Sequence, residues 1–167
     1  MWHANGHKLA IQINISAGDL DEPALVTHIA KHLHLNYVEP NCLTLEITEN
    51  LVISNQSESL KALQQLRDLG IGISLDDFGT GYSSMTLLHQ LPLTQIKIDR
   101  SFVIGMEDNN KHTAIVQSTL DLSIKMGLEV IAEGVENGHQ AQLLKQMNCA
   151  LIHGYDLAKP MPAEKLD

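Results

Sequence analysis

The stretch IGISLDDFGTGYSS, residues 71–84, indicates how this chain folds. Apolar residues at every second position, from Ile71 to Leu75, alternate with small or polar ones, and two adjacent carboxylates, Asp76 and Asp77, follow. Alternation with period two places the apolar residues on one face of a β-strand. Neighbouring carboxylates repel each other, so a pair removed from water needs a positive group beside it. The stretch therefore predicts a strand that ends at a charged site, with Asp77 already in the following loop.

The same alternation recurs along the chain, each time followed by a segment with helical periodicity. Strands are expected at residues 9–15, 42–48, 71–76, 95–99, 128–132 and 150–152. Helices are expected at residues 23–35, 56–69, 84–90, 111–126 and 139–147. Repeated strand–helix units predict an α/β fold with a parallel sheet and right-handed crossovers.

The two faces of the predicted strands differ in polarity. Parallel strands covered by helices on both faces are usually apolar throughout. Here one face of each strand is apolar, and the other carries polar groups toward its C-terminal end, such as Asn14, Glu46 and Lys97. A barrel lumen with an active site at the C-terminal ends of the strands accounts for this pattern, whereas an open doubly wound sheet does not. The sequence therefore favours a (β/α)8 TIM-like barrel.

Oxygen-bearing side chains follow several of these strands. Asn14, Glu46, Asp76 and Asp77 offer carboxylate and amide oxygens, which suit hard cations such as Mg²⁺ or Mn²⁺ better than zinc. Two such ions about 4 Å apart are a common device for activating water against a phosphodiester. Taken alone, the aspartate pair is more often a solvated turn, but matching strand ends make a metal site the better interpretation.

Lys97 and Glu133 end two further predicted strands. Lys97 is expected to orient the attacking water or to offset developing charge, and Glu133 to act as a base; the residues alone do not separate these roles. The string Asp77-Phe78-Gly79 also occurs in protein kinases, but the other kinase motifs are absent from the sequence.

Composition excludes other classes of function. The net charge is −9, from 11 basic and 20 acidic residues, which argues against duplex nucleic acid as a partner. The two cysteines, Cys42 and Cys149, have neither zinc spacing nor a disulfide pattern, so a reduced, cytoplasmic location is expected. No apolar run has the roughly 20 residues of a membrane span, and the first residues do not resemble a signal peptide.

Ordered motifs along nearly the whole chain resemble those of the EAL-domain family of bacterial cyclic-di-GMP phosphodiesterases. They are INIS (13–16), LEITEN (45–50), LDDFGTGYSS (75–84), IKIDRSFV (96–103), VIAEGVEN (130–137) and HGYDLAKPMP (153–162). The resemblance implies a modified TIM-like barrel that hydrolyses cyclic di-GMP to linear pGpG with Mg²⁺ or Mn²⁺, through a two-metal site in a complete domain.

The resemblance also assigns a role to each candidate position. Metal ligands are expected at Asn14, Glu46, Asp76 and Asp77. Positioning or deprotonation of the attacking water is expected from Lys97 and Glu133. Substrate contacts are expected from Asp99, Glu136 and His153, and support of the 76–84 loop is expected from Glu49.

Two departures from the family pattern lower the activity that is expected of this chain. Residues 1–167 are interpreted as a single EAL-type domain without its first two strands and first helix, and so with about six of the eight strands of a barrel. The missing segment contains the Glu-Ala-Leu motif, whose glutamate is a metal ligand in the family. His153 also stands where the family's QGY motif has glutamine.

Three functions therefore remain open. The chain is an EAL-type phosphodiesterase with impaired hydrolysis, or an inactive module that binds cyclic di-GMP or a protein partner, or a fragment of an active parent. A six-stranded remainder would leave two unpaired sheet edges, which predicts a homodimer that covers them.

Overall fold

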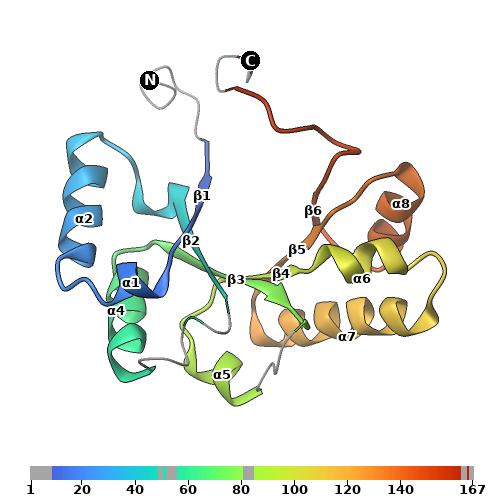
Figure 1. Ribbon diagram of the computed structural model, residues 1–167, viewed down its shortest axis with the longest axis horizontal. Helices are drawn as coiled ribbons and strands as arrows, with labels where there is room; N and C mark the ends of the chain where they lie inside the picture. The colour runs from blue at the N-terminus through green and yellow to red at the C-terminus, as the bar shows by residue number, and fades with distance from the viewer. Residues whose placement is uncertain (1–8, 49–50, 52–55, 81–84, 163–164, 166–167) are drawn as a thin grey trace. The chain divides into compact units, whose positions relative to one another are not determined.

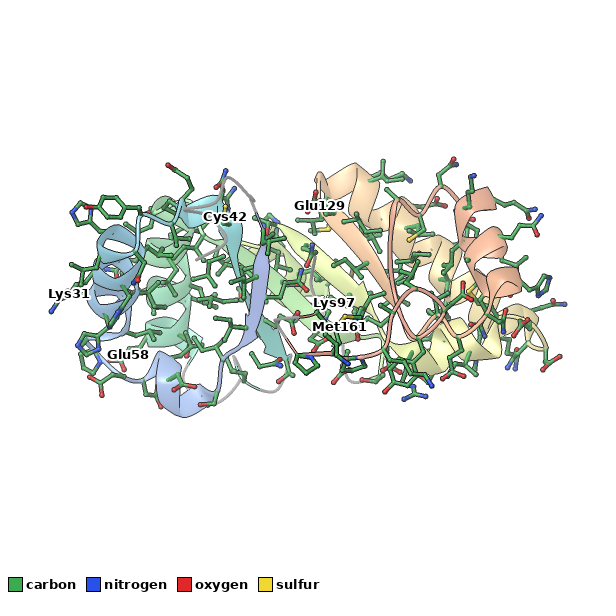
Figure 2. The ribbon with its side chains drawn as sticks, turned by 90° about the horizontal axis from the view of Figure 1, so that it is seen from above. Lys31, Cys42, Glu58, Lys97, Glu129 and Met161 are labelled. Atoms are coloured by element: carbon green, nitrogen blue, oxygen red, sulfur yellow. The ribbon has the colours of Figure 1, made fainter. Side chains whose placement is uncertain are left out.

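The computed structural model describes residues 9–48, 51, 56–80, 85–162 and 165. The chain divides into two compact units, Met1–Ile96 and Lys97–Asp167. The ribbon of both units is shown in Figure 1, and their side chains are shown in Figure 2.

Strands and helices alternate in the first unit. Its elements are β1 (Ile11–Asn14), α1 (Ala17–Leu20), α2 (Leu25–Leu35), the 3-10 helix η2 (Pro40–Cys42), β2 (Leu43–Thr48), α4 (Gln56–Asp68), β3 (Gly72–Phe78) and α5 (Met85–Gln90). β1 pairs with β2 and β2 with β3, both in parallel. Strand β4 (Gln95–Ile98) begins in this unit and ends in the next. These strands lie within two residues of the predicted bounds, and the parallel pairing is confirmed.

The core of the first unit lies between the strands and α4. Leu45 and Ile47 of β2 and Ile73 and Leu75 of β3 are buried, as their alternation predicts. On α4, the apolar positions that face them are also buried, including Leu63. Burial of apolar area of this kind is the main favourable contribution to folding.

Strand β1 departs from the prediction. Its apolar face was expected to be covered by helices, yet Ile11 and Ile13 are 47% and 49% exposed. The neighbouring helices α1 and α2 contact α4. The side chains of Ile11 and Ile13 are therefore left about half in solvent, and the expectation of a covered face is wrong for this strand.

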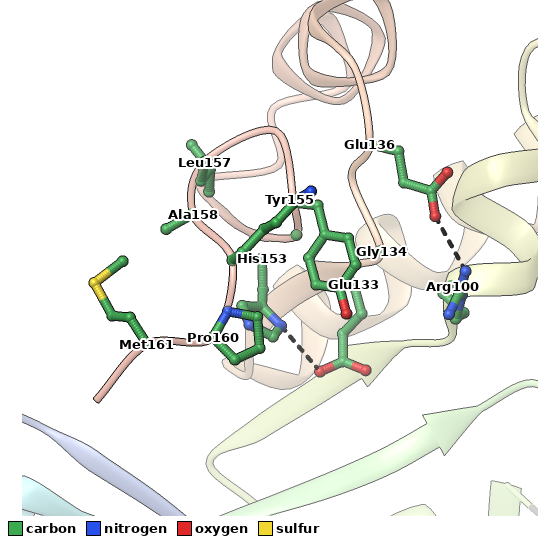
Figure 3. Close-up of a pocket in the computed structure, with 12 residues that line it drawn as sticks. Arg100, Glu133, Gly134, Glu136, His153, Tyr155, Leu157, Ala158, Pro160 and Met161 are labelled. Atoms are coloured by element: carbon green, nitrogen blue, oxygen red, sulfur yellow. Dashed lines mark hydrogen bonds and ion pairs between the residues drawn. The ribbon is translucent and has the colours of Figure 1, made fainter. Parts of the chain in front are cut away.

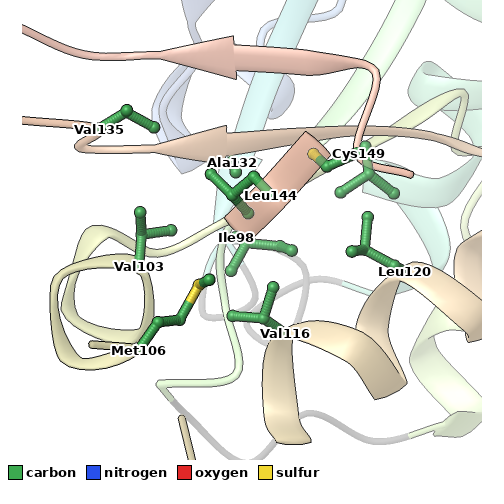
Figure 4. Packing of buried hydrophobic residues seen from close by; sticks show 10 residues of the cluster. Ile98, Val103, Met106, Val116, Leu120, Ala132, Val135, Leu144 and Cys149 are labelled. Carbon is green, nitrogen blue, oxygen red and sulfur yellow. The ribbon is translucent and has the colours of Figure 1, made fainter. Parts of the chain in front are cut away.

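The second unit repeats the strand–helix order. After the end of β4, its elements are α6 (Arg100–Gly105), α7 (Asn110–Met126), β5 (Glu129–Glu133), α8 (Gly138–Gln146) and β6 (Leu151–His153). β5 and β6 pair in parallel. One apolar cluster forms its core (Figure 4), made of Ile98, Val103, Met106, Val116, Leu120, Val130, Ala132, Val135, Leu144 and Cys149.

Side-chain caps set the helix starts in this unit. Asp99, Asn109 and Asn137 each accept a hydrogen bond from a backbone N–H of the helix that follows. Such caps satisfy N–H groups that have no partner within the helix. Helix α7 ends at Gly127, which has a left-handed φ of 70°, as its sequence position predicts.

None of the helices among the described residues is long and apolar enough to cross a membrane.

Candidate functional site

A row of polar side chains crosses the three paired strands of the first unit. In the strand register, Asn14 lies opposite Glu46, and Glu46 lies opposite Ser74. Glu46 is only 7% exposed, and Ser74 is fully buried. Within the described residues, the Ser74 Oγ has no hydrogen-bond partner. A buried hydroxyl without a partner is rare in folded proteins and points to a missing ligand or water beside it.

Asp76 and Asp77 follow this row along β3. Asp76 lies opposite Thr48, two residues beyond Ser74 and therefore on the same face of the strand. Asp77 was expected to lie in the loop, but β3 continues to Phe78, so that expectation is wrong. The backbone of the strand is distorted at Asp77, one residue before its end.

The distortion is a left-handed backbone at Asp77, with φ of 54°. The Asp77 N–H donates to Asp76 Oδ1 at 3.0 Å, and the Asp77 carbonyl accepts from Thr80 Oγ1 at 2.9 Å. A residue other than glycine held in this region costs about 1–3 kcal/mol, and such strain clusters at functional sites. Residues 76–80 thus form a fixed turn at the carboxylate pair.

A short ion pair lies in the second unit. Lys97 Nζ is 2.6 Å from Glu133 Oε1, and the two side chains are 9% and 19% exposed. His153 lies opposite Glu133 in the register of β5 and β6, with its Nδ1 3.7 Å from the same carboxylate oxygen. Figure 3 shows this contact from the side of the pocket. Three of the predicted site residues are therefore brought together.

A pocket of about 580 Å³ lies beside this pair. It is lined by Arg100, Glu133, Gly134, Glu136, His153, Gly154, Tyr155, Leu157, Ala158, Lys159, Pro160 and Met161. On one wall, Arg100 Nη2 donates to Glu136 Oε1 at 3.0 Å, and both side chains are exposed (Figure 3). The pocket offers a cation, acceptor oxygens and an aromatic ring to a ligand.

Two glycines allow the walls of this pocket to approach each other. Gly134 has φ of 72°, and a Cβ there would lie 2.4 Å from the Cβ of Arg100. A Cβ on Gly154 would lie 2.1 Å from the Val135 carbonyl oxygen. The adjacent backbone is joined by a hydrogen bond of 3.1 Å from the Val135 N–H to the His153 carbonyl. Only glycine fits at either position.

The remaining predicted site residues lie elsewhere. Asp99 caps α6: its Oδ1 accepts a hydrogen bond of 3.0 Å from the Ser101 N–H, and Asp99 does not line the pocket. Glu49 lies outside the described residues. Sequence reasoning missed Arg100 and Tyr155, although both stand inside motifs that it had singled out, one residue after Asp99 and two after His153.

Comparisons of the sequence with known proteins agree on one family. The sequence matches the family model of the EAL domain over residues 1–160. It is 37% identical over its whole length to the signaling protein YkoW of Bacillus subtilis, of which it covers 21%. It is 38% identical over 99% of its length to the bifunctional diguanylate cyclase/cyclic di-GMP phosphodiesterase MucR of Pseudomonas aeruginosa, of which it covers 24%. The chain thus spans less than a quarter of these curated relatives.

Solved structures agree. A MucR phosphodiesterase in complex with c-di-GMP superimposes with a TM-score of 0.92 at 38% identity, covering 99% of this chain and 68% of the other. The EAL domain of Mycobacterium smegmatis DcpA gives a TM-score of 0.93 at 34% identity, covering 99% of this chain and 75% of the other. Klebsiella pneumoniae BlrP1 with manganese and cyclic di-GMP gives a TM-score of 0.84 at 30% identity, covering 92% of this chain and 39% of the other.

The predicted fold class is confirmed by these likenesses, because EAL domains have a TIM-like barrel fold and this chain carries six of its β-strands with their helices. The matched family model spans nearly the whole sequence, from before the first of the quoted motifs to within the last. The chain belongs to the EAL domain family.

Proposed function

We propose that this chain supplies catalytic and substrate-binding residues of a metal-dependent phosphodiesterase that hydrolyses cyclic di-GMP to linear pGpG. The observation that supports this most strongly is the short Lys97–Glu133 ion pair, largely buried beside the pocket that His153 and Glu136 line. A partly buried ion pair beside a pocket is a common feature of active sites. Phosphodiesterases among its EAL relatives support the same reaction.

The residues of the first unit offer oxygen donors of the kind that hard divalent cations prefer, although no three His, Cys, Asp or Glu side chains of the described residues are grouped closely enough to hold a metal ion by themselves. Glu46 presents a buried carboxylate between Asn14 and Ser74, whose hydroxyl lacks a described partner, and Asp76 lies on the same face. We assign Asn14, Glu46, Asp76 and Asp77 as ligands for Mg²⁺ or Mn²⁺ because all four offer oxygen. Cations of this kind supply stabilisation of the charge that develops on the transferred phosphate.

Lys97 and Glu133 divide the proton chemistry between them. The Lys97 ammonium lies against the Glu133 carboxylate and compensates its charge within this largely buried pair. We assign Glu133 as the base that takes a proton from the attacking water, and Lys97 as the group that orients this water and offsets charge on the phosphate.

The pocket supplies the substrate contacts in this proposal. A guanine base carries N–H donors, and the exposed carboxylate of Glu136 is an acceptor for them. His153 can donate or accept a hydrogen bond at the same wall. Asp99 acts by starting α6 immediately before Arg100, and Glu49 supports the loop after Asp77.

Residues 1–167 form one EAL-type domain in this proposal, located in the cytoplasm. We propose a homodimer as its assembly, because the half-exposed Ile11 and Ile13 lie on a strand whose apolar face needs a cover. Sedimentation over a tenfold range of protein concentration tests this assembly. A well-folded monomer throughout would contradict it.

One observation favours a second function, a module that binds cyclic di-GMP without cleaving it. His153, where the family motif has glutamine, places an imidazole 3.7 Å from Glu133, so it competes with Lys97 and water for this carboxylate. Hydrolysis is therefore expected below the 1–10³ per second that is typical of enzymes.

One experiment separates these outcomes. Cyclic di-GMP is titrated calorimetrically into the chain with Mg²⁺, Mn²⁺ or Ca²⁺, and pGpG is quantified by chromatography. Glu133→Gln should abolish pGpG formation and retain binding, while Gln142→Ala on the exposed side of α8 should change neither. Binding without turnover in the unmodified chain would favour the binding module. Neither binding nor turnover would overturn the proposed function.

A further inference from the structure

Glu107, between α6 and α7, is the centre of a hydrogen-bond network that reaches the start of α8. Its Oε2 accepts hydrogen bonds from Asn137 Nδ2 at 3.2 Å and Gln140 Nε2 at 3.0 Å. Its Oε1 lies 2.8 Å from His139 Nδ1. The contacts with His139, Asn137 and Gln140 lower the pKa of Glu107, in that order of importance. This network lies outside the proposed catalytic groups.

Gln140 connects the network to the pocket. Its side chain is 2% exposed, and its Oε1 accepts a hydrogen bond of 2.8 Å from the Glu136 N–H. The other end of the same amide donates to Glu107. Since one neighbour is a donor and the other an acceptor, only one orientation of the amide satisfies both. Gln140 therefore holds the main chain at Glu136 in a defined place.

We propose that Gln140 is a positioning residue: anchored by Glu107, it fixes the backbone of Glu136 and with it the Arg100–Glu136 wall of the pocket. The claim that this wall contacts cyclic di-GMP rests on the proposed function. The hydrogen-bond geometry itself does not.

The ion pair in the wall is too weak to fix this position. Arg100 and Glu136 are 64% and 46% exposed, and ion pairs between exposed side chains contribute little to stability. A buried amide with both ends bonded is costly to disturb, because any displacement leaves a polar group without a partner. The rigidity of the wall therefore comes from Gln140, on the side away from solvent.

An isosteric substitution tests this role. Gln140→Glu keeps the size of the side chain and an oxygen facing Glu136, but it sets a second carboxylate against Glu107. At pH 7, exchange of the Glu136 amide hydrogen, followed by NMR, should become about threefold to tenfold faster, as expected for the loss of one hydrogen bond. Exchanging the two side chains, in Glu107→Gln/Gln140→Glu, restores a donor–acceptor pair between positions 107 and 140, with loss of the Asn137 contact to Oε2, and should restore slow exchange.

Controls separate this role from general destabilisation. Gln142→Glu adds the same charge on the exposed side of α8 and should leave Glu136 exchange unchanged. Glu107→Ala removes the anchor of Gln140 together with the contacts to Asn137 and His139, and it should accelerate exchange at Glu136 while exchange at Leu144, deep in α8, stays slow. Unchanged Glu136 exchange in Glu107→Ala, or in a folded Gln140→Glu, would overturn the proposal. Failure of the double variant to recover slow exchange at Glu136 would also overturn it. If Gln140→Glu does not fold, failure of the double variant to fold would overturn it as well.

A kinetic measurement extends the test to the substrate. Because the wall binds rather than reacts, Gln140→Glu should raise KM for cyclic di-GMP more than it lowers kcat, and the double variant should reverse this. A fall in kcat with an unchanged KM for cyclic di-GMP would contradict a positioning role at the wall. If the unmodified chain does not bind the nucleotide, the proposed function fails, while the amide exchange still decides the role of Gln140.

Discussion

Ser74 in β3 lies directly opposite Glu46 in β2, and its fully buried hydroxyl has no hydrogen-bond partner among the described residues. A buried hydroxyl without a partner lowers the stability of the protein, because it has lost its hydration and gained no hydrogen bond in return. The same hydroxyl is in place to bond a ligand or water beside Glu46.

Ser74→Ala should therefore stabilise the protein without metal. Removing the unsatisfied hydroxyl is expected to raise the free energy of unfolding by about 1 kcal/mol, measured by urea denaturation with a chelator present. Affinity for Mn²⁺, measured by calorimetry, should fall at the same time. Destabilisation by the alanine would show that Ser74 has a partner in solution.

Substitution of Asp77 should reveal the strain at the end of β3. Its φ of 54° is accessible to glycine at little cost, so Asp77→Gly should gain about 1 kcal/mol in unfolding free energy without metal. Asparagine also tolerates this region, and Asp77→Asn is the control that removes charge alone. Both variants should weaken Mn²⁺ binding. Equal stability of the glycine variant and the unmodified chain would indicate that the turn carries no strain.

The lowered pKa of Glu107 predicts a pH-dependent contribution to stability. Because the folded pKa lies below the ordinary value of 4.5, the stabilisation is fully present above that value and is lost as pH falls through the folded pKa. Glu107→Gln should be less stable than the unmodified chain at pH 7, and the difference should shrink below about pH 4.5. Urea denaturation of both proteins from pH 7 to pH 3.5 measures it. A difference independent of pH would exclude the carboxylate as its source.

Breaking the Lys97–Glu133 pair should be costly. Lys97→Met leaves Glu133 largely buried and without its cation, and the loss of one member of such a pair is expected to cost about 3 kcal/mol. Lys97→Met/Glu133→Gln should recover part of this cost, because no uncompensated charge remains. Unfolding free energies of the single and double variants form a complete cycle. Additive losses would show that the two groups are not coupled.

Much of this arrangement could be predicted from the pattern of residues. Period-two alternation correctly places Leu45, Ile47, Ile73 and Leu75 in the core, because residues two apart share one face of a strand. Alternation at Ile11 gave the same prediction and was wrong, since burial depends on what packs over a strand and not on the strand alone.

The end of a strand is harder to predict than its existence. Asp77 carries no signal that distinguishes a loop from a strand with one left-handed residue, because both satisfy the neighbouring hydrogen bonds. The short helix after Asp99 was also missed: six residues give too little periodicity, although Asp99 followed by Ser101 is a recognisable cap. The contact of Gln140 with Glu136 depends on rotamers, which no spacing reveals.

Gly134 and Gly154 leave no space for a side chain where the walls of the pocket meet. In evolution, that part of the pocket has a fixed shape, because any side chain added there collides with Arg100 or with the backbone of Val135. The pocket wall from Tyr155 to Met161 is exposed and lies within the family motif at residues 153–162. Substitutions in this segment change the surface offered to a ligand without the collision that a side chain at Gly134 or Gly154 would cause, so this segment is the shortest route to a redesigned pocket.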